Sequence, residues 1–169
     1  GVQASLLVQQ GVTLGHRELP VLYARLDPDK HVLKFAVVAD HDGIGALPLA
    51  TVHLRALLVG AGHVGHSLFE AYSAGFPGAR FKVWNRTIAK AEAMAEELGI
   101  GVARDLETAV GEADIVTSAT MSTEPLIRGD WLQPGQHLDL IGAYRPDMRE
   151  ADDAALQRAR VFVDSRDTT

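Results

Sequence analysis

The stretch that decides the fold lies at residues 56–65, which read ALLVGAGHVG. Four apolar residues, typical of a buried strand, run directly into a complete G-x-G-x-x-G pattern. A helix-length segment follows to about residue 72, and a second apolar strand begins at residue 81. This order of strand, glycine-rich turn, helix and strand predicts a βαβ unit that binds a dinucleotide.

Each glycine of the pattern has its own structural role. Gly60 permits the tight turn, Gly62 lets a pyrophosphate approach the backbone, and Gly65 lets the helix pack closely on the strand. The free N–H groups at the start of the helix, where His63 and Val64 lie, then face the phosphate charge. We therefore expect these five residues to bind the cofactor. The alternative is a glycine-rich turn that holds no ligand.

The end of the second strand indicates which dinucleotide binds. Residues 84–87 read WNRT, and Lys90 follows one helical turn later. An NAD site usually has Asp or Glu here, bonded to the ribose 2′-hydroxyl. Arg86 can instead form two hydrogen bonds to a 2′-phosphate, and Asn85, Thr87 and Lys90 complete the candidate set. NADP(H) is therefore favoured and NAD(H) stays possible. The alternative is that Arg86 and Lys90 are ordinary solvated residues at a helix start.

Mostly small residues lie at the ends of two further predicted strands, 115–118 and 138–141, and directly after them. The carboxyl ends of parallel strands face the ligand crevice, so small side chains there leave room for the nicotinamide ribose. The alternative is that they only pack a sheet edge. The candidates in these two places are Ser118, Ala119 and Thr120, then Ile141, Gly142 and Ala143.

Strand and helix patterns alternate through the rest of the chain. Strands are expected at 56–59, 81–84, 101–103, 115–118, 138–141 and 161–163, and a helix at 88–98, capped by Thr87 and stopped by Gly99. Shorter helices are expected at 105–110 and 152–158, the second with its cap at Asp152. The predicted fold class is α/β, a doubly wound parallel-sheet Rossmann domain over residues 55–169.

The first 54 residues have a different character. Apolar runs at 20–27 and 31–39 lie between turn residues and predict a small antiparallel meander, and residues 1–17 predict another strand and a turn. A small β-rich domain is therefore expected over residues 1–54.

Charge and composition exclude several kinds of partner. The 169 residues carry 16 Lys and Arg against 22 Asp and Glu, for a net charge of −6, and contain no Cys. We expect no nucleic-acid partner, no membrane partner, no thiolate metal site and a cytoplasmic location. His63 and His66 have no carboxylate near them in sequence, so no metal site is predicted. The acidic residues between 147 and 153 are expected to form a solvated loop and a helix cap.

A series of further motifs, in order along residues 56–165, is similar to one known family. They read VGAG at 59–62, WNRT at 84–87, ADIV at 113–116, STEP at 122–125, WLQPG at 131–135, GAYRPDMRE at 142–150 and VDS at 163–165. On these residues the chain resembles the ornithine cyclodeaminase and mu-crystallin family. The WNRT segment is similar to the mu-crystallin branch, whose members are NADPH-dependent ketimine reductases.

The resemblance implies an NAD(P)H-dependent reductase of ketimine or cyclic-imine amino acids, of the pyrroline- or piperideine-2-carboxylate type. Its partner is then a small amino-acid or imino-acid substrate. Two alternatives stay open: an ornithine cyclodeaminase, which forms proline and ammonia and recycles NAD, and a protein that binds a dinucleotide or small ligand without turnover.

The first fifty residues resemble, more faintly, the family's substrate and dimerisation domain. The segment around Lys34 is similar to the one that carries the family's active-site lysine. This implies that Lys34 is catalytic, holding the substrate carboxylate or donating a proton to the imine, and that a homodimer is possible. The alternative is a surface lysine on an edge strand.

Four departures from the family's pattern matter. Leu6 falls where the family has an active-site arginine, and Tyr144 falls where the cyclodeaminase branch has a catalytic Asp. His53 runs almost directly into the dinucleotide turn, without the family's intervening helix. Family members also continue past the position of Thr169. We therefore expect an intact cofactor domain joined to an incomplete substrate domain.

Overall fold

A seven-stranded sheet forms the centre of the computed structural model. The structure describes the backbone of residues 6–9, 13–14, 17–18, 21–27 and 32–38 and the continuous stretch 54–163. The order of strands across the sheet is β11-β1-β10-β9-β6-β7-β8. Their bounds are β1 Leu6–Gln9, β6 Arg55–Val59, β7 Arg80–Trp84, β8 Gly101–Val102, β9 Ile115–Ser118, β10 His137–Leu140 and β11 Arg160–Val163.

Five of the six strands predicted for the parallel sheet form it, whereas the sixth, predicted at 161–163, is β11 and pairs antiparallel with β1. β10, β9, β6, β7 and β8 pair in parallel with their neighbours, and the order reverses direction beside β6. In an open α/β sheet, such a reversal opens a crevice at the carboxyl ends of the strands. The glycine-rich turn after β6 lies at that point.

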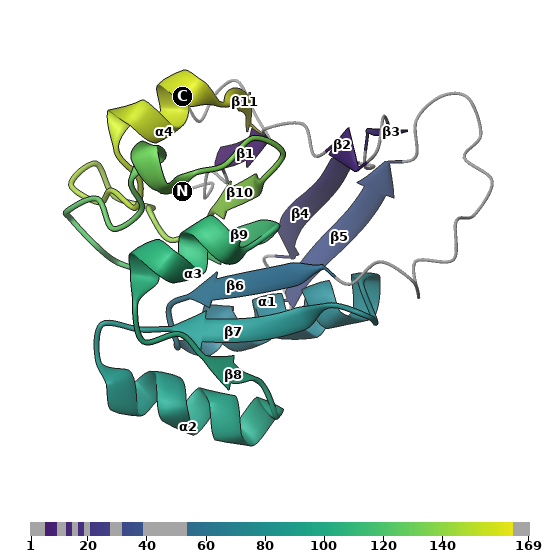
Figure 1. Ribbon diagram of the computed structural model, residues 1–169, viewed down its shortest axis with the longest axis vertical. Helices are drawn as coiled ribbons and strands as arrows, with labels where there is room; N and C mark the ends of the chain where they lie inside the picture. Colours follow the sequence, from purple (N-terminus) through teal and green to yellow (C-terminus); the bar gives the residue numbers. More distant parts are fainter. Residues whose placement is uncertain are drawn as a thin grey trace.

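Helices cover both faces of the sheet (Figure 1). α1 (His63–Gly75) and α2 (Ile88–Leu98) share one apolar core with alternate residues of β6, β7 and β9. α3 (Leu106–Glu112), the short η2 (Gly129–Trp131) and α4 (Asp153–Arg158) share the other. Leu58 faces the first core and Leu57 the second, as the alternation of a strand buried on both faces requires. The predicted doubly wound α/β architecture is confirmed.

Local sequence explains where the helices begin and end. Thr87 is the N-cap of α2, and Gly99 ends it in the left-handed conformation, with φ of 67°. The Asp152 side chain accepts a hydrogen bond from the Ala155 N–H at 2.9 Å and so caps α4. All three predicted boundaries are confirmed, although the Thr87 side chain makes no capping hydrogen bond. None of the helices in the part of the chain that the structure describes is long and apolar enough to cross a membrane.

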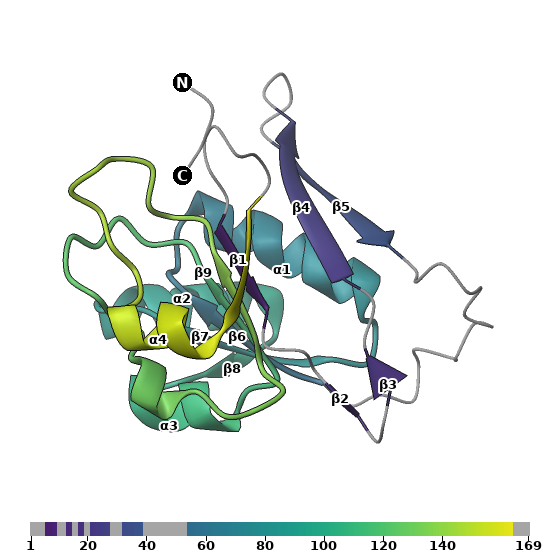
Figure 2. The same ribbon diagram turned by 90° about the horizontal axis from the view of Figure 1, so that it is seen from above.

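The described strands before residue 54 form two hairpins and one strand of the main sheet. β4 (Val21–Asp27) pairs antiparallel with β5 (Val32–Val38), which confirms the predicted meander, and β2 (Thr13–Leu14) pairs with β3 (Arg17–Glu18). β5 lies against α1 (Figure 2). β1 differs from expectation, because it pairs antiparallel with both β10 and β11 inside the main sheet.

Candidate functional site

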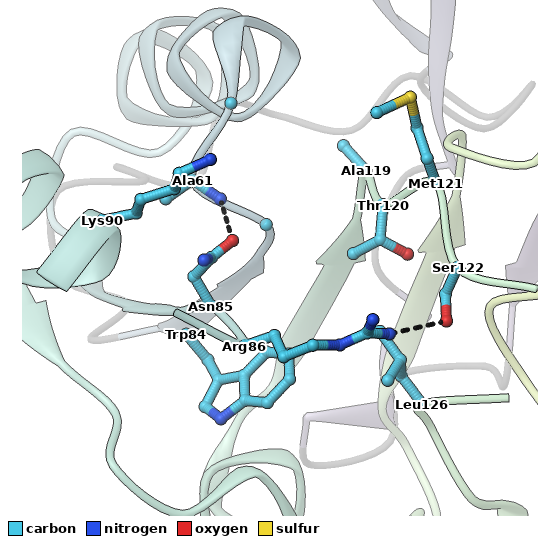
Figure 3. A pocket seen from close by; sticks show the side chains of 12 residues that line it. Ala61, Trp84, Asn85, Arg86, Lys90, Ala119, Thr120, Met121, Ser122 and Leu126 are labelled. Carbon is cyan, nitrogen blue, oxygen red and sulfur yellow. Dashed lines mark hydrogen bonds between the residues drawn. The ribbon is translucent and has the colours of Figure 1, made fainter. Parts of the chain in front are cut away.

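A pocket of about 390 Å³ lies at the carboxyl ends of β6, β7 and β9 (Figure 3). This volume falls in the range of small-molecule sites. Its walls are the glycine-rich turn, the end of β7 with the start of α2, and the loop after β9. The lining residues are Gly60, Ala61, Gly62, Trp84, Asn85, Arg86, Lys90, Ala119, Thr120, Met121, Ser122 and Leu126.

The three glycines of the turn lie in three different environments. Gly60 has φ of +112°, and a Cβ there would lie 2.7 Å from the Ala119 carbonyl oxygen. A Cβ on Gly65 would overlap the carbonyl oxygen of Gly60. A Cβ on Gly62 would meet nothing within 4 Å. The tight turn at Gly60 and the close packing at Gly65 are confirmed, and the open space beside Gly62 fits a group that approaches the backbone.

Asn85 connects the turn to the end of β7. Its Oδ1 accepts a hydrogen bond from the Ala61 N–H at 3.2 Å, and its Nδ2 donates to the Thr87 carbonyl at 3.0 Å. The Gly60 N–H also donates to the Trp84 carbonyl at 2.8 Å. These bonds hold the glycine turn against the strand end that would carry the ribose-recognition residues.

Arg86 connects the end of β7 to the loop after β9. Its Nη2 donates to the Ser122 Oγ at 3.2 Å, and the Ser122 hydroxyl donates in turn to the Glu124 carbonyl at 2.7 Å. In Figure 3 the Arg86 side chain extends from the strand end toward Ser122. Among the lining residues, Arg86 and Lys90 carry positive charge and none carries a carboxylate. This part of the pocket therefore suits an anionic ligand.

The predicted cofactor residues divide into two groups. Gly60, Gly62, Asn85, Arg86, Lys90, Ala119 and Thr120 line the pocket. The others lie beside the lining rather than in it. His63 and Val64 are exposed at the start of α1, Gly65 is buried beneath the turn, Thr87 is exposed at the N-cap of α2, Ser118 is buried at the end of β9, and Ile141, Gly142 and Ala143 are half-buried after β10.

Sequence reasoning missed Ala61, Trp84, Met121, Ser122 and Leu126 as lining residues. Ala61, Trp84 and Ser122 lie inside the motifs VGAG, WNRT and STEP, so their place in these motifs was a usable indication. Met121 and Leu126 lie outside these motifs in the irregular loop after β9, and no periodicity predicts which way the side chains of that loop point.

The expectation that residues 147–153 form a solvated acidic loop is wrong for Glu150, which is only 2% exposed. Asp147 is exposed and paired with Arg145, whereas Asp152 caps α4 as predicted. The Glu150 carboxylate accepts hydrogen bonds from the Ser118 hydroxyl, from Thr120 and from the Gly142 N–H. Burial raises the pKa of this carboxyl, although these hydrogen bonds act in the opposite direction.

A second buried polar cluster connects β9, β10 and α1. Asp139 accepts hydrogen bonds from the Tyr72 hydroxyl and the Thr117 hydroxyl, each at 3.2 Å. Burial raises the pKa of Asp139 to about 6 and lowers the pKa of His137, on the same strand, to about 4. Among the described residues, no group of three or more His, Cys, Asp or Glu side chains could hold a metal ion.

The candidate substrate-side residues are only partly described. Lys34 lies in β5, opposite Arg25 of β4, and its side chain is outside the described part of the chain. Leu6 lies in β1, opposite Leu140. Tyr144 is exposed in the loop after β10, and its hydroxyl lies 4.0 Å from the sulfur of Met121, which lines the pocket.

Comparison with known proteins gives consistent matches. The family model of the ornithine cyclodeaminase/mu-crystallin family matches residues 39–169. Delta(1)-pyrroline-2-carboxylate reductase of Paracoccus denitrificans (strain Pd 1222) is 50% identical over 145 residues, which cover 82% of this chain and 46% of that protein. Ketimine reductase mu-crystallin of Rattus norvegicus is 38% identical over 112 residues, 65% of this chain and 36% of that protein.

Among solved structures, a probable ornithine cyclodeaminase from Bordetella pertussis Tohama I has a TM-score of 0.55 and 31% identity, over 62% of this chain and 35% of that chain. Thermococcus litoralis Delta(1)-pyrroline-2-carboxylate reductase, in complex with NADH and L-proline, shares the fold with a TM-score of 0.56 at 24% identity, over 62% of this chain and 34% of that one. The chain spans less than half the length of the curated relatives named above. It belongs to the ornithine cyclodeaminase/mu-crystallin family.

Proposed function

We propose that this chain forms the dinucleotide-binding part of an NAD(P)H-dependent reductase of ketimine or cyclic-imine amino acids, of the pyrroline- or piperideine-2-carboxylate type. The observation that carries the proposal is the pocket itself. A glycine turn with open space beside Gly62 faces Arg86 at the end of β7, at the strand ends where α/β sheets bind nucleotides. The 50% identity to a pyrroline-2-carboxylate reductase supports the substrate class.

In this proposal, the chain's own residues bind and orient the reactants. The backbone N–H groups at the start of α1 hold the pyrophosphate, and Arg86 binds a 2′-phosphate, which favours NADP(H) with NAD(H) possible. The bound dihydronicotinamide supplies the hydride that reduces the imine carbon. Lys34 holds the substrate carboxylate or gives a proton to the imine nitrogen, so that C=N becomes CH–NH.

A cyclodeaminase is the second candidate. The observation that favours it is the 31% identity to a probable ornithine cyclodeaminase. Two features count against it: Tyr144 stands where the resemblance implies a catalytic Asp, and Arg86 stands where NAD sites usually have an acid. A protein that binds a dinucleotide without turnover is the third candidate. Leu6 supports it, because leucine stands where the family has an active-site arginine and cannot bind a carboxylate.

We also propose a division into a partial substrate or dimerisation domain, residues 1–54, and a cofactor domain, residues 55–169, with β1 crossing into the main sheet. A homodimer formed through the first part, and a cytoplasmic location, remain predictions. Light scattering on the purified protein measures the oligomeric state directly.

Calorimetric titration of the wild-type protein with NADPH and with NADH tests the proposal. We expect NADPH to bind more tightly, and Arg86→Ala to weaken NADPH binding by about tenfold or more while changing NADH little. Lys82→Ala is the matched control, because Lys82 lies in β7 four residues before Arg86, pairs with Glu112 and does not line the pocket. Tighter binding of NADH, or no effect of Arg86→Ala, would favour the cyclodeaminase.

Turnover separates the three candidates. A reductase consumes NADPH with pyrroline-2-carboxylate or piperideine-2-carboxylate. A cyclodeaminase releases ammonia and proline from ornithine with no net change in NADH. A binding protein shows a dissociation constant for the dinucleotide and neither activity. Absence of turnover with every imine acid would refute the reductase proposal.

A further inference from the structure

The Glu150 carboxylate lies behind the pocket, between the ends of two strands. Its Oε1 accepts hydrogen bonds from the Ser118 hydroxyl at 2.6 Å, the Thr120 N–H at 2.7 Å and the Thr120 hydroxyl at 2.8 Å. Its Oε2 accepts one from the Gly142 N–H at 2.6 Å. One side chain therefore bridges the residues that follow β9 and those that follow β10.

The backbone around Glu150 is bonded to the same loop. The Glu150 carbonyl accepts hydrogen bonds from the N–H groups of Leu126 and Ile127, each at 2.9 Å, and the Arg149 N–H donates to the Ser122 carbonyl at 2.7 Å. Thr120, Ser122 and Leu126 line the pocket. The pocket wall formed by the loop after β9 is thus attached at both ends to residues 149–150.

This wall is in direct contact with the glycine turn. A Cβ on Gly60 would lie 2.7 Å from the Ala119 carbonyl oxygen and 3.3 Å from the Thr120 Cγ2, so the two walls touch with no spare room. On the other side, a Cβ on Gly142 would overlap the backbone of Thr120 and lie 2.7 Å from the Glu150 Oε1. A shift of the Thr120 backbone would therefore displace the glycine turn, which lines the pocket.

Only a carboxylate satisfies this set of partners. Two of the four donors are backbone N–H groups, which cannot reverse their direction, and they bond to different oxygens of Glu150. An amide of the same shape would place its NH₂ group against one of these N–H groups. All four partners are neutral, so the buried charge is stabilised by hydrogen bonds alone, an arrangement that is unfavourable for stability compared with an apolar core.

We propose that Glu150 is a positioning residue for dinucleotide binding: its carboxylate fixes the loop after β9 against the glycine turn and so sets the width of the cofactor pocket. The inference rests on the proposed function, because it takes the pocket to be a dinucleotide site. Glu150 does not line the pocket and acts through Thr120 and its neighbours.

The test is the dissociation constant for NADPH of Glu150→Gln, measured by tryptophan fluorescence, to which the pocket residue Trp84 contributes. Glu150→Gln keeps the shape and loses one backbone hydrogen bond to a charged acceptor, so we expect the dissociation constant to rise by about tenfold or more. The measurement is made well below the melting temperature, where the variant is folded.

Asp152→Ala is the matched control. Asp152 lies two residues away and accepts hydrogen bonds from the N–H groups of Gly129 and Ala155, outside the pocket. We expect both variants to melt at a lower temperature than wild type, and only Glu150→Gln to lose affinity. A Glu150→Gln protein that melts earlier but binds NADPH within twofold of wild type would overturn the inference and leave Glu150 a structural residue.

Ser118→Ala keeps the inference testable if Glu150→Gln does not fold. It removes one of the four donors at a buried position that does not line the pocket, and we expect a several-fold loss of affinity. Unchanged affinity in Ser118→Ala would then refute the inference. Wild-type protein that binds no dinucleotide would refute the proposed function and this inference together, whereas binding that the variants do not weaken refutes this inference alone.

Discussion

Comparing Gly62→Ala with Gly60→Ala distinguishes a glycine needed for binding from one needed for folding. Gly62 is the N-cap of α1, with φ of −105° and ψ of −174°, a conformation that alanine adopts without strain. A Cβ there meets nothing within 4 Å. Alanine is a poorer N-cap than glycine by about 0.5 kcal/mol. In the opposite direction, alanine restricts the unfolded chain, which stabilises the folded state by a similar free energy. We therefore expect the free energy of unfolding to change by no more than about 0.5 kcal/mol.

Binding should respond very differently. The Cβ of Gly62→Ala occupies the open space where a pyrophosphate would approach the backbone. Loss of one hydrogen bond between an N–H group and a charged phosphate is worth about 1.5 to 3 kcal/mol, so the dissociation constant for NADPH should rise by about tenfold or more.

Gly60→Ala is the matched variant in the same turn. Its φ of +112° is unfavourable for any residue with a Cβ, which costs about 1 to 3 kcal/mol. Contact of the new Cβ with the Ala119 carbonyl, 2.7 Å away, adds at least about 1 kcal/mol. We expect Gly60→Ala to lose about 2 kcal/mol or more of folding free energy before any effect on binding is considered.

Urea unfolding and NADPH titration of both variants provide the comparison. The expected pattern is a stable Gly62→Ala protein that does not bind well and a destabilised Gly60→Ala protein. A Gly62→Ala protein with wild-type affinity would show that the turn does not hold phosphate. A large loss of stability in Gly62→Ala would show that the space beside this residue is not open.

Three further predictions concern stability. The pKa of Asp139 is raised from 3.8 to about 6, which penalises the folded state by up to about 3 kcal/mol above pH 6 and not at all below pH 3.8. Asp139→Asn should therefore unfold at higher urea concentration than wild type at pH 7, and should lack the wild type's gain in stability between pH 6 and pH 4; equal pH profiles would contradict this. The pKa of His66 is raised, chiefly by its hydrogen bond to the Gly62 carbonyl and further by Glu97, so His66→Ala should be less stable than wild type below pH 6.5, with the difference shrinking as the pH rises through the raised pKa; a difference that grows with pH would refute this. Asp152→Ala removes the cap of α4 and should lower the free energy of unfolding by about 1 kcal/mol, measured by urea unfolding.

Local patterns were sufficient to predict most of the elements. The apolar run before Gly60 predicts β6, and the pattern between Thr87 and Gly99 predicts α2 with the bounds that the structure has. These features depend on side-chain periodicity and on hydrogen bonds within one helical turn, which a sequence displays directly.

Burial and side-chain contact were decided by the tertiary structure. Glu150 lies among other acidic residues in the sequence, yet it is buried because its donors come from Ser118 and Thr120, 32 and 30 residues earlier. β1 enters the main sheet by pairing with strands near the other end of the chain, and Arg86 reaches Ser122 across the pocket. The glycine pattern by itself determined where a nucleotide could bind. The walls of that pocket follow from long-range hydrogen bonds, whose partners no local pattern specifies because only the folded chain brings them together.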